Sequence, residues 1–219
     1  MWPFNRERNA KKPLLAPGFV DWHSHILPGV DDGVQTMDEA LEILGCYERL
    51  GIGEVWLTPH IMEDIPNTTG DLRSRFAELQ AAYEGPVRLR LAAENMLDNL
   101  FEERLEAGDL LPLGEAGDAL LVETSYLQPP VGLGERLERI RKKGFTPVLA
   151  HPERYLYMSE RDYQALKQAG TAFQLNVASL AGTYGKHVCA NAERLRRKGW
   201  YEYAGTDLHN LHMMHKILK

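Results

Sequence analysis

The sequence predicts a single α/β domain built on parallel β-strands, and three observations support this expectation. Seven apolar, strand-like segments alternate with amphipathic helical segments, which is the order of successive β–α units. A length of 219 residues, of which 44% are hydrophobic, suits one substantial core. Metal-binding side chains directly follow six of the seven strand-like segments. From the pattern alone, a closed seven-stranded barrel and an open doubly wound sheet both satisfy these observations.

Each predicted strand is a short apolar run bounded by polar or turn-forming residues. In chain order, the strands are expected at residues 19–25, 54–59, 87–93, 119–123, 146–150, 172–176 and 201–205. Helices are expected between and after them, over residues 36–50, 71–83, 99–107, 134–143, 159–169 and 185–198. The first helix has the clearest boundaries, because Thr36 and Glu39 have capping-box spacing and Gly51 follows the last turn. We expect residues 1–18 to form a flexible tail and residues 19–219 to form the domain.

The composition argues against several other classes of protein. The sequence has no run of eighteen or more apolar residues, so we expect no transmembrane segment. The basic N-terminal stretch lacks the apolar region of a secretory signal. Cys46 and Cys189 have no CxxC spacing and are expected to be reduced thiols, which together with the absent signal predicts a cytoplasmic protein. The net charge of −6 argues against nucleic acid as the main partner, because phosphate backbones require a basic surface.

The most informative run covers residues 21–33, DWHSHILPGVDDG. His23 and His25 are two positions apart, so in an extended strand their side chains project from the same face. Asp31 and Asp32 follow within the same run. Two imidazoles held side by side supply half of a metal site, and nearby carboxylates can supply more of it.

Histidine or acidic side chains stand at the ends of six of the seven predicted strands, the first included. The residues concerned are His23, His25, His60, Glu94, Glu123, His151, Asp207 and His209. In a parallel barrel the carboxyl ends of all strands meet on one face, where such folds build active sites. One such residue alone is more often a helix cap or a solvated loop group. Eight of them in one chain are far less expected by chance, so the sequence predicts a metal centre.

The types of ligand indicate which metals and which chemistry to expect. Imidazoles and carboxylates without cysteine favour manganese, iron or zinc. With Asp32 included, nine candidate ligands exceed the need of one ion, so two or three divalent ions are expected. Clustered ions activate water and stabilise both the attacking and the leaving oxygen of an in-line displacement. Phosphoester hydrolysis is a reaction of this kind.

Arg154 lies three residues beyond His151, on the same predicted rim. Its guanidinium group could bind phosphate oxygens through two hydrogen bonds. The alternative is a surface salt bridge with Glu153 or with a helix carboxylate. The sequence leaves both interpretations open.

Six strings carry a resemblance to a known family. HSHILPGVDDG, TPH, AEN, VETS, LAHPERY and GTDLHN occur in this order between residues 19 and 210, and they resemble the PHP (polymerase and histidinol phosphatase) superfamily. More closely, they are similar to the bacterial manganese-dependent protein-tyrosine phosphatases of capsule and exopolysaccharide operons. The resemblance implies a distorted (β/α)7 TIM-like barrel of the PHP type. It also implies hydrolysis of phosphotyrosine on the tail of a cognate bacterial tyrosine autokinase, which would regulate capsule and exopolysaccharide synthesis.

The resemblance also implies roles for individual residues. His23, His25, Glu94 and Asp207 would hold one metal ion, most simply manganese. Glu94, Glu123 and His151 would hold a second ion, with Glu94 bridging, and Asp32, His60 and His209 would hold a third. A metal-bridging hydroxide would attack phosphorus directly, and Arg154 would bind the phosphate. Asp31 matches no ligand and is expected to cap or to support one.

Two other functions remain open at this stage. The first is a small-molecule PHP phosphatase such as histidinol phosphatase, although those relatives have a different stretch after the paired histidines, without Asp31-Asp32. The second is a catalytically silent metal-binding regulator of the kinase, against which the complete ligand set argues. Relatives usually continue through another helix beyond the position of His209, so the barrel is expected to be either a shortened natural form or a truncated one. The sequence predicts no oligomeric state.

Overall fold

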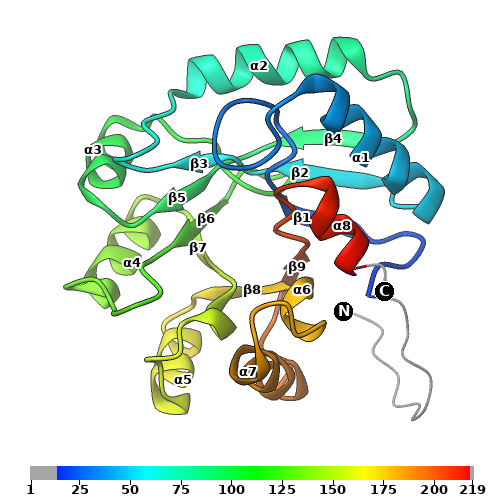
Figure 1. Ribbon diagram of the computed structural model, residues 1–219. Coiled ribbons are helices and arrows are strands. Elements are labelled where there is room, and N and C mark those ends of the chain that lie inside the picture. Colours follow the sequence, from blue (N-terminus) through cyan, green and yellow to red (C-terminus); the bar gives the residue numbers. More distant parts are fainter. Residues whose placement is uncertain (1–13, 218–219) are drawn as a thin grey trace.

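Short parallel strands form two neighbouring sheets in the computed structural model, which describes residues 14–217 (Figure 1). The first sheet has the order β1 (Val20–Ser24), β2 (Glu54–Leu57) and β4 (Arg88–Leu91). The second has the order β3 (His60–Ile61), β5 (Glu94–Met96), β6 (Ala119–Glu123), β7 (Thr146–Ala150), β8 (Ala172–Asn176) and β9 (Tyr203–Gly205). Every pairing between these strands is parallel. The predicted α/β class with parallel strands is therefore confirmed.

Two of the seven predicted strands each divide in two. The segment 54–59 forms β2 in the first sheet and then continues into β3 of the second, and the segment 87–93 likewise forms β4 and leads into β5. Pro59 stands at the first break, where it has no N–H to donate to a ladder. At the second break the hydrogen bonds change partner, since Ala92 donates to Leu57 (2.9 Å) and Ala93 donates to Leu111 (3.2 Å). These breaks carry the chain from one sheet to the other.

The two sheets also meet at β1. The N–H of Asp207 donates to the carbonyl of His23 (2.8 Å), and the N–H of His25 donates to the carbonyl of Leu208 (2.9 Å). Thus the segment that follows β9 runs beside the end of β1. An apolar cluster with members from both sheets fills the space that they share. Within it, Trp22 of β1 stacks on Trp56 of β2 at 5.4 Å between ring centroids.

The helices lie around the outside of the strands (Figure 1). The longer ones are α1 (Met37–Leu50), α2 (Thr69–Ala82), α3 (Asn99–Ala107), α4 (Leu133–Lys142), α5 (Glu160–Gln168) and α7 (Lys186–Arg197), close to the predicted ranges. The shorter ones are a 3-10 turn (Pro152–Arg154), α6 (Val177–Leu180) and α8 (Leu211–Ile217). Thr36 accepts the N–H of Glu39 at the start of α1, and Gly51 ends it in the left-handed region, with φ 72°. The Glu39 side chain accepts from the N–H of Leu211 instead (3.0 Å) and so joins α1 to α8.

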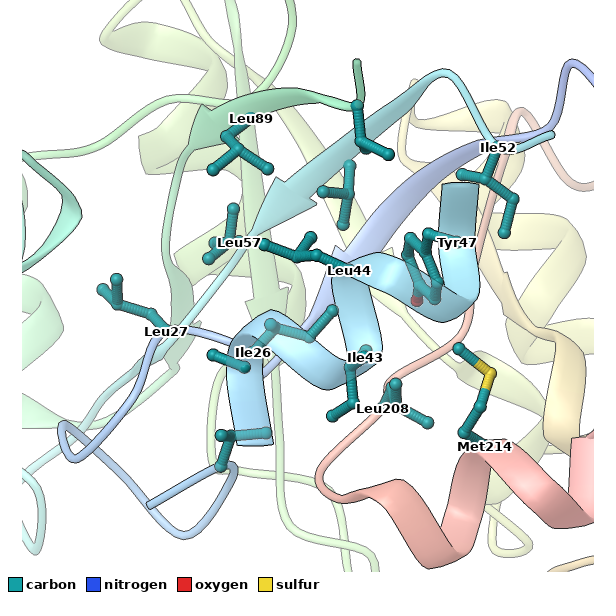
Figure 2. Packing of buried hydrophobic residues seen from close by; sticks show 14 of the residues in the cluster. Ile26, Leu27, Ile43, Leu44, Tyr47, Ile52, Leu57, Leu89, Leu208 and Met214 are labelled. Atoms are coloured by element: carbon teal, nitrogen blue, oxygen red, sulfur yellow. The ribbon is translucent and has the colours of Figure 1, made fainter. Parts of the chain in front are cut away.

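Burial of the inner face of α1 holds this helix against the first sheet. Ile43, Leu44 and Tyr47 are fully buried, and Figure 2 shows them beside Leu208 and Met214. Complete burial of one such aliphatic side chain contributes about 1.5–3 kcal/mol. This burial fixes α1 against one face of the first sheet.

The expected N-terminal tail is described only in part. Residues 1–13 lie outside the described residues. Leu15 is 3% exposed within the core, and Gly18 donates its N–H to the carbonyl of Gly51 (2.9 Å). No helix within residues 14–217 has the length and apolar character needed to cross a membrane.

Candidate metal centre

The nine predicted ligands meet at the carboxyl ends of the strands. They are His23, His25, Asp32, His60, Glu94, Glu123, His151, Asp207 and His209. Eight of them supply donor atoms to groups whose members lie within 4.8 Å of one another. The ninth, His151, has its Nε2 atom 2.9 Å from Oε1 of Glu94. The arrangement predicted from strand ends is therefore present as a single cluster.

Four of these residues form the tightest part of the cluster, called here the inner group: His23, His25, Glu94 and Asp207. The Nε2 atoms of His23 and His25 lie 3.1 Å apart, as their spacing predicts. Both also lie close to Glu94 Oε2, at 3.2 and 3.3 Å, and to Asp207 Oδ1, at 3.5 and 3.4 Å. Four potential ligand atoms thus converge on one point.

Neighbouring side chains fix which nitrogen of each imidazole faces this point. His23 donates through Nδ1 to Gln174 Oε1 (2.6 Å), and the Gln174 amide is oriented by its own donation to the carbonyl of Trp22. His25 donates through Nδ1 to Asp31 Oδ2 (2.8 Å). With the protons on Nδ1, both Nε2 lone pairs point toward the carboxylates. In this tautomer the lone pairs and the carboxylate oxygens face one another, so a cation between them, either a proton or a metal ion, stabilises the arrangement.

The backbone around the two histidines is shaped for this approach. The register of β1 against β2 shifts between Asp21 and Ser24, and such irregularities redirect side chains at the edges of active sites. A Cβ atom on Gly33 would lie 2.4 Å from the Cβ of His25, and one on Gly205 would lie 2.3 Å from the Cβ of His23. Glycine at both positions lets the flanking segments pack directly against the imidazoles.

The remaining ligands extend the cluster toward solvent. Nδ1 of His60 lies 3.2 Å from both Glu94 Oε2 and Glu123 Oε1. Its Nε2 lies 3.5 Å from Asp32 Oδ1, as does Nε2 of His209. Asp32 and His209, called here the outer pair, have side chains that are 66% and 23% exposed. Interaction with His209 lowers the pKa of Asp32 to about 2.

The observed grouping differs in detail from the expected partition of ligands. The inner group agrees with it. The second grouping contains His60 together with Glu94 and Glu123, where His151 was expected, and His25 lies close to the third. His151 Nε2 is nearer to Glu94 (2.9 Å) than to Glu123 (3.9 Å). Glu94 is therefore the carboxylate that faces the largest number of imidazoles.

Electrostatics keep the buried carboxylates charged. Burial alone would raise the pKa of Glu94, but the nearby His23 and the other imidazoles hold it well below its ordinary value. The pKa of Asp207 is likewise lowered against the effect of burial. Burial would lower the pKa of His25, yet hydrogen bonds with Asp207 and Asp31 raise it well above its ordinary value. The cluster thus attracts positive charge strongly, as a site for divalent cations does.

The donor set fits such cations in two further respects. Glu94 Oε2, His60 Nδ1 and His151 Nδ1 are buried and have no hydrogen-bond partner among the described residues, although buried polar atoms are normally paired. The ligands are imidazoles and carboxylates, which suit manganese, iron and zinc. His151 and Asp207 also have positive φ angles, 34° and 52°. Such strain in residues other than glycine occurs mainly at functional sites.

Arg154 lies at the edge of the cluster and not in a surface salt bridge. Its Nη1 donates to Asp207 Oδ2 (3.1 Å), and its guanidinium lies over the rings of Tyr126 (4.1 Å) and Tyr184 (4.3 Å). The alternative partner, Glu153, is fully buried and accepts from other groups. Arg154 therefore borders the site, and its salt bridge is with Asp207 and not with Glu153.

Several contributors to the site were not predicted from the sequence. Gln174 orients His23, and the rings of Tyr126 and Tyr184 cover Arg154. A glutamine inside an otherwise apolar strand was the one available signal. Asn176, which was a candidate either to cap α6 or to support a ligand, does both: it accepts from Ala178 N and donates to Asp207 Oδ2 (2.7 Å).

Comparisons with known proteins show which chains this one is similar to. The family described as "Capsular polysaccharide synthesis, CpsB/CapC" matches residues 19–216. The tyrosine-protein phosphatase YwqE of Bacillus subtilis is 27% identical over 198 residues, covering 88% of this chain and 78% of YwqE. The tyrosine-protein phosphatase CpsB of Streptococcus pneumoniae is 27% identical over 208 residues, covering 88% of this chain and 83% of CpsB. A chain from the crystal structures of these two proteins, described as metal-dependent tyrosine phosphatases, superposes with a TM-score of 0.80 at 27% identity, over 88% of this chain and 80% of that one.

Proposed function

This chain belongs to the CpsB/CapC family of capsular polysaccharide synthesis, and we propose that it is a metal-dependent protein-tyrosine phosphatase. The observation that carries the proposal is the convergence of His23, His25, Glu94 and Asp207 at one point beside Arg154. Relatives with the same fold are tyrosine-protein phosphatases, and one solved relative is described as metal-dependent.

The proposed roles follow from where each side chain lies. The inner group would hold one ion, Glu94 with Glu123 and His60 or His151 a second, and Asp32, His60 and His209 a third. Manganese is the ion that we propose. Divalent ions in such a cluster activate water for attack and stabilise charge on phosphoryl oxygens.

Other side chains would orient the ligands and bind the phosphoryl group. Asp31 and Gln174 hold the two imidazoles with Nε2 toward the ions. Arg154, with donors left in its guanidinium plane, would bind the phosphoryl oxygens and orient the phosphorus atom. Direct attack by water needs no phosphoenzyme. Accordingly, neither Cys46 on α1 nor Cys189 on α7 belongs to the cluster.

The substrate that we propose is phosphotyrosine on the tail of a bacterial tyrosine kinase, whose dephosphorylation would regulate capsule or exopolysaccharide synthesis. The family description and the relatives' activity support this choice. A cytoplasmic location completes the proposal and is supported by the two unpaired cysteines.

We also propose the finer form of the fold. Residues 19–219 would form one domain in which the two sheets complete a distorted (β/α)7 barrel of the PHP superfamily. The hydrogen bonds between β1 and the segment after β9, and the two strands that pass from one sheet to the other, support closure.

The test is hydrolysis of a phosphotyrosine peptide by the purified protein with manganese, with chelator, and after Arg154→Ala. We expect metal-dependent turnover that falls about 10²- to 10³-fold in the arginine variant, the range found when a group that stabilises transition-state charge is removed. Arg73→Ala is the matched control, because Arg73 is exposed on α2. Histidinol phosphate, assayed in parallel, should be a poor substrate. Absence of turnover on both compounds with any metal would contradict the proposal and would favour a silent regulator.

A further inference from the structure

Two aromatic rings contact the guanidinium of Arg154. Its carbon atom Cζ is 4.1 Å from the ring centroid of Tyr126 and 4.3 Å from that of Tyr184. Tyr126 belongs to the loop after β6, and Tyr184 belongs to the segment between α6 and α7. Two segments distant in sequence thus supply one ring each, and Arg154 comes from a third, the 3-10 turn after β7.

Both tyrosines are fastened to the metal centre through their hydroxyl groups. The hydroxyl of Tyr126 donates to Glu123 Oε2 (3.2 Å). The hydroxyl of Tyr184 accepts from Asn176 Nδ2 (3.1 Å) and lies 3.5 Å from Asp207 Oδ2. Each ring is therefore held between a group of the cluster at one end and the arginine beneath its face.

These contacts affect how an anion can approach the guanidinium group. The guanidinium group of Arg154 has five N–H donors, and its hydrogen bond to Asp207 is the one that it forms among the described residues. Because two rings lie within 4.3 Å of its central carbon, the guanidinium offers an oxyanion its N–H groups along the edge, where two parallel hydrogen bonds form. The rings also attract the cation and keep water from its faces.

We propose that Tyr126 and Tyr184 are positioning residues that hold Arg154 in the orientation needed to bind the phosphoryl group. This inference rests on the proposed phosphatase function, because it assumes that Arg154 binds phosphate. The rings carry the effect through their contact with the guanidinium, and the hydrogen bonds of the hydroxyl groups are secondary to it. Each tyrosine is assigned a role through Arg154 and none in the chemical step itself.

The experiment compares variants that keep the ring with variants that lose it. Tyr126→Leu and Tyr184→Leu should each weaken inhibition by inorganic phosphate about 5- to 30-fold, the range expected for one cation–π contact. KM for a phosphotyrosine peptide should rise in parallel, with a smaller change in kcat. Tyr126→Phe and Tyr184→Phe should stay within about threefold of the parent, which a hydroxyl-dependent role would not allow. Tyr83→Leu, at the end of α2 and hydrogen-bonded to Glu48, controls for general loss of a tyrosine.

A double-mutant cycle shows whether the two tyrosines act through Arg154 or contribute to phosphate binding independently of it. In the Arg154→Ala background, neither Leu substitution should weaken phosphate inhibition further, since the group that it positions is gone. Equal losses with and without Arg154 would overturn the inference, and so would Leu variants that bind phosphate like the parent.

A spectroscopic readout makes the test independent of activity. The Nε–H resonance of Arg154, assigned by its absence in Arg154→Ala, should be shifted upfield by the two rings in metal-free protein. It should keep that shift in the Phe variants and lose part of it in each Leu variant. Where a Leu variant does not fold, Tyr126→Met or Tyr184→Met replaces it. Parent protein that shows the ring shift but hydrolyses no phosphotyrosine peptide would contradict the proposed function, whereas active parent protein without the shift would contradict the positioning role.

Discussion

The inner group and the outer pair differ in how much of their geometry exists before any ion binds. The inner side chains are at most 3% exposed, and Gln174 and Asp31 hold the two imidazoles in place. In the outer pair, Asp32 is 66% exposed and sits opposite His209 at 3.5 Å. One end of the same cluster is thus fixed by packing, and the other remains adaptable.

This difference has a physical consequence for metal binding. The ligand side chains of the inner group are already ordered in the folded protein. An ion that binds there therefore incurs little further loss of side-chain entropy. An ion at the outer pair must still order Asp32 and displace solvent from it. We therefore expect tight, slowly exchanging metal at the inner group and weaker, exchangeable metal at the outer pair.

The largest effect should follow removal of the central carboxylate. Glu94 faces His23, His25 and His60 through Oε2 and His151 through Oε1. In Glu94→Gln an amide replaces the charge that those imidazoles and the ions share, so kcat/KM should fall at least about 10³-fold, because metal stabilisation is worth several kcal/mol. Activity assays together with elemental analysis measure the loss of turnover and of bound metal.

The matched control for this change is Glu103→Gln, since Glu103 is exposed on α3. It should retain parental activity and metal content. If Glu94→Gln kept all of its metal and most of its activity, the central role assigned to Glu94 would be wrong.

A smaller and reversible effect is expected at the outer pair. Asp32→Ala removes one exposed ligand but leaves the inner group intact, so kcat/KM should fall about 10²-fold at low manganese and recover as manganese is raised. The reason is that weakened affinity can be offset by concentration, whereas a lost inner site cannot. Titration of activity against manganese measures the manganese concentration at half-maximal activity for the parent and for Asp32→Ala. A loss in Asp32→Ala that saturating manganese does not relieve would remove the distinction between the two regions.

Sequence reasoning could predict that the candidate ligands lie together because all of them except Asp32 stand at or shortly after a strand end. His23, His60, Glu94 and Glu123 follow or end apolar runs, so local pattern and the geometry of parallel sheets suffice to bring them together. The partner of His23 is different. Gln174 is 151 positions away on β8, which pairs with β7 and β9, so tertiary packing brings it within reach of His23, and local pattern does not encode that packing.

The same reasoning explains the partial success with the fold. Pro59 marks the break between β2 and β3, and its missing N–H is visible in the sequence. The second break, at Ala92-Ala93, has no comparable signal, because two alanines fit any element. The stacking of Tyr126 and Tyr184 on Arg154 depends on three loops whose relative placement follows from tertiary packing alone.

A moderate effect is expected where a ligand is only reoriented. Asp31→Asn keeps the size of the side chain but weakens its acceptance of the His25 proton, which at present fixes Nε2 toward the inner group. Loss of such a supporting hydrogen bond typically costs 10- to 100-fold in metal affinity or activity, and we expect about 10-fold here, since the amide oxygen can still accept one of the two backbone N–H groups, of His60 or of Gly33, that now hold the carboxylate. Metal affinity of the parent and the variant, measured by competition with a chelating dye, tests this. An unchanged affinity would mean that packing alone orients His25.

The smallest expected effect is the stabilisation of the fold by manganese. It distinguishes the inner group from the outer pair without an activity assay. Manganese at about 100 times its dissociation constant stabilises a protein by about 2.7 kcal/mol, which for a chain of this length corresponds to a rise in Tm of about 5–11 °C. Because the inner group is buried, most of this rise should persist in Asp32→Ala and disappear in Glu94→Gln. Thermal unfolding with manganese or with chelator measures it. A rise that Asp32→Ala abolished as completely as Glu94→Gln would show that the exposed end of the cluster contributes as much binding free energy as the buried end, and preorganisation would then not distinguish them.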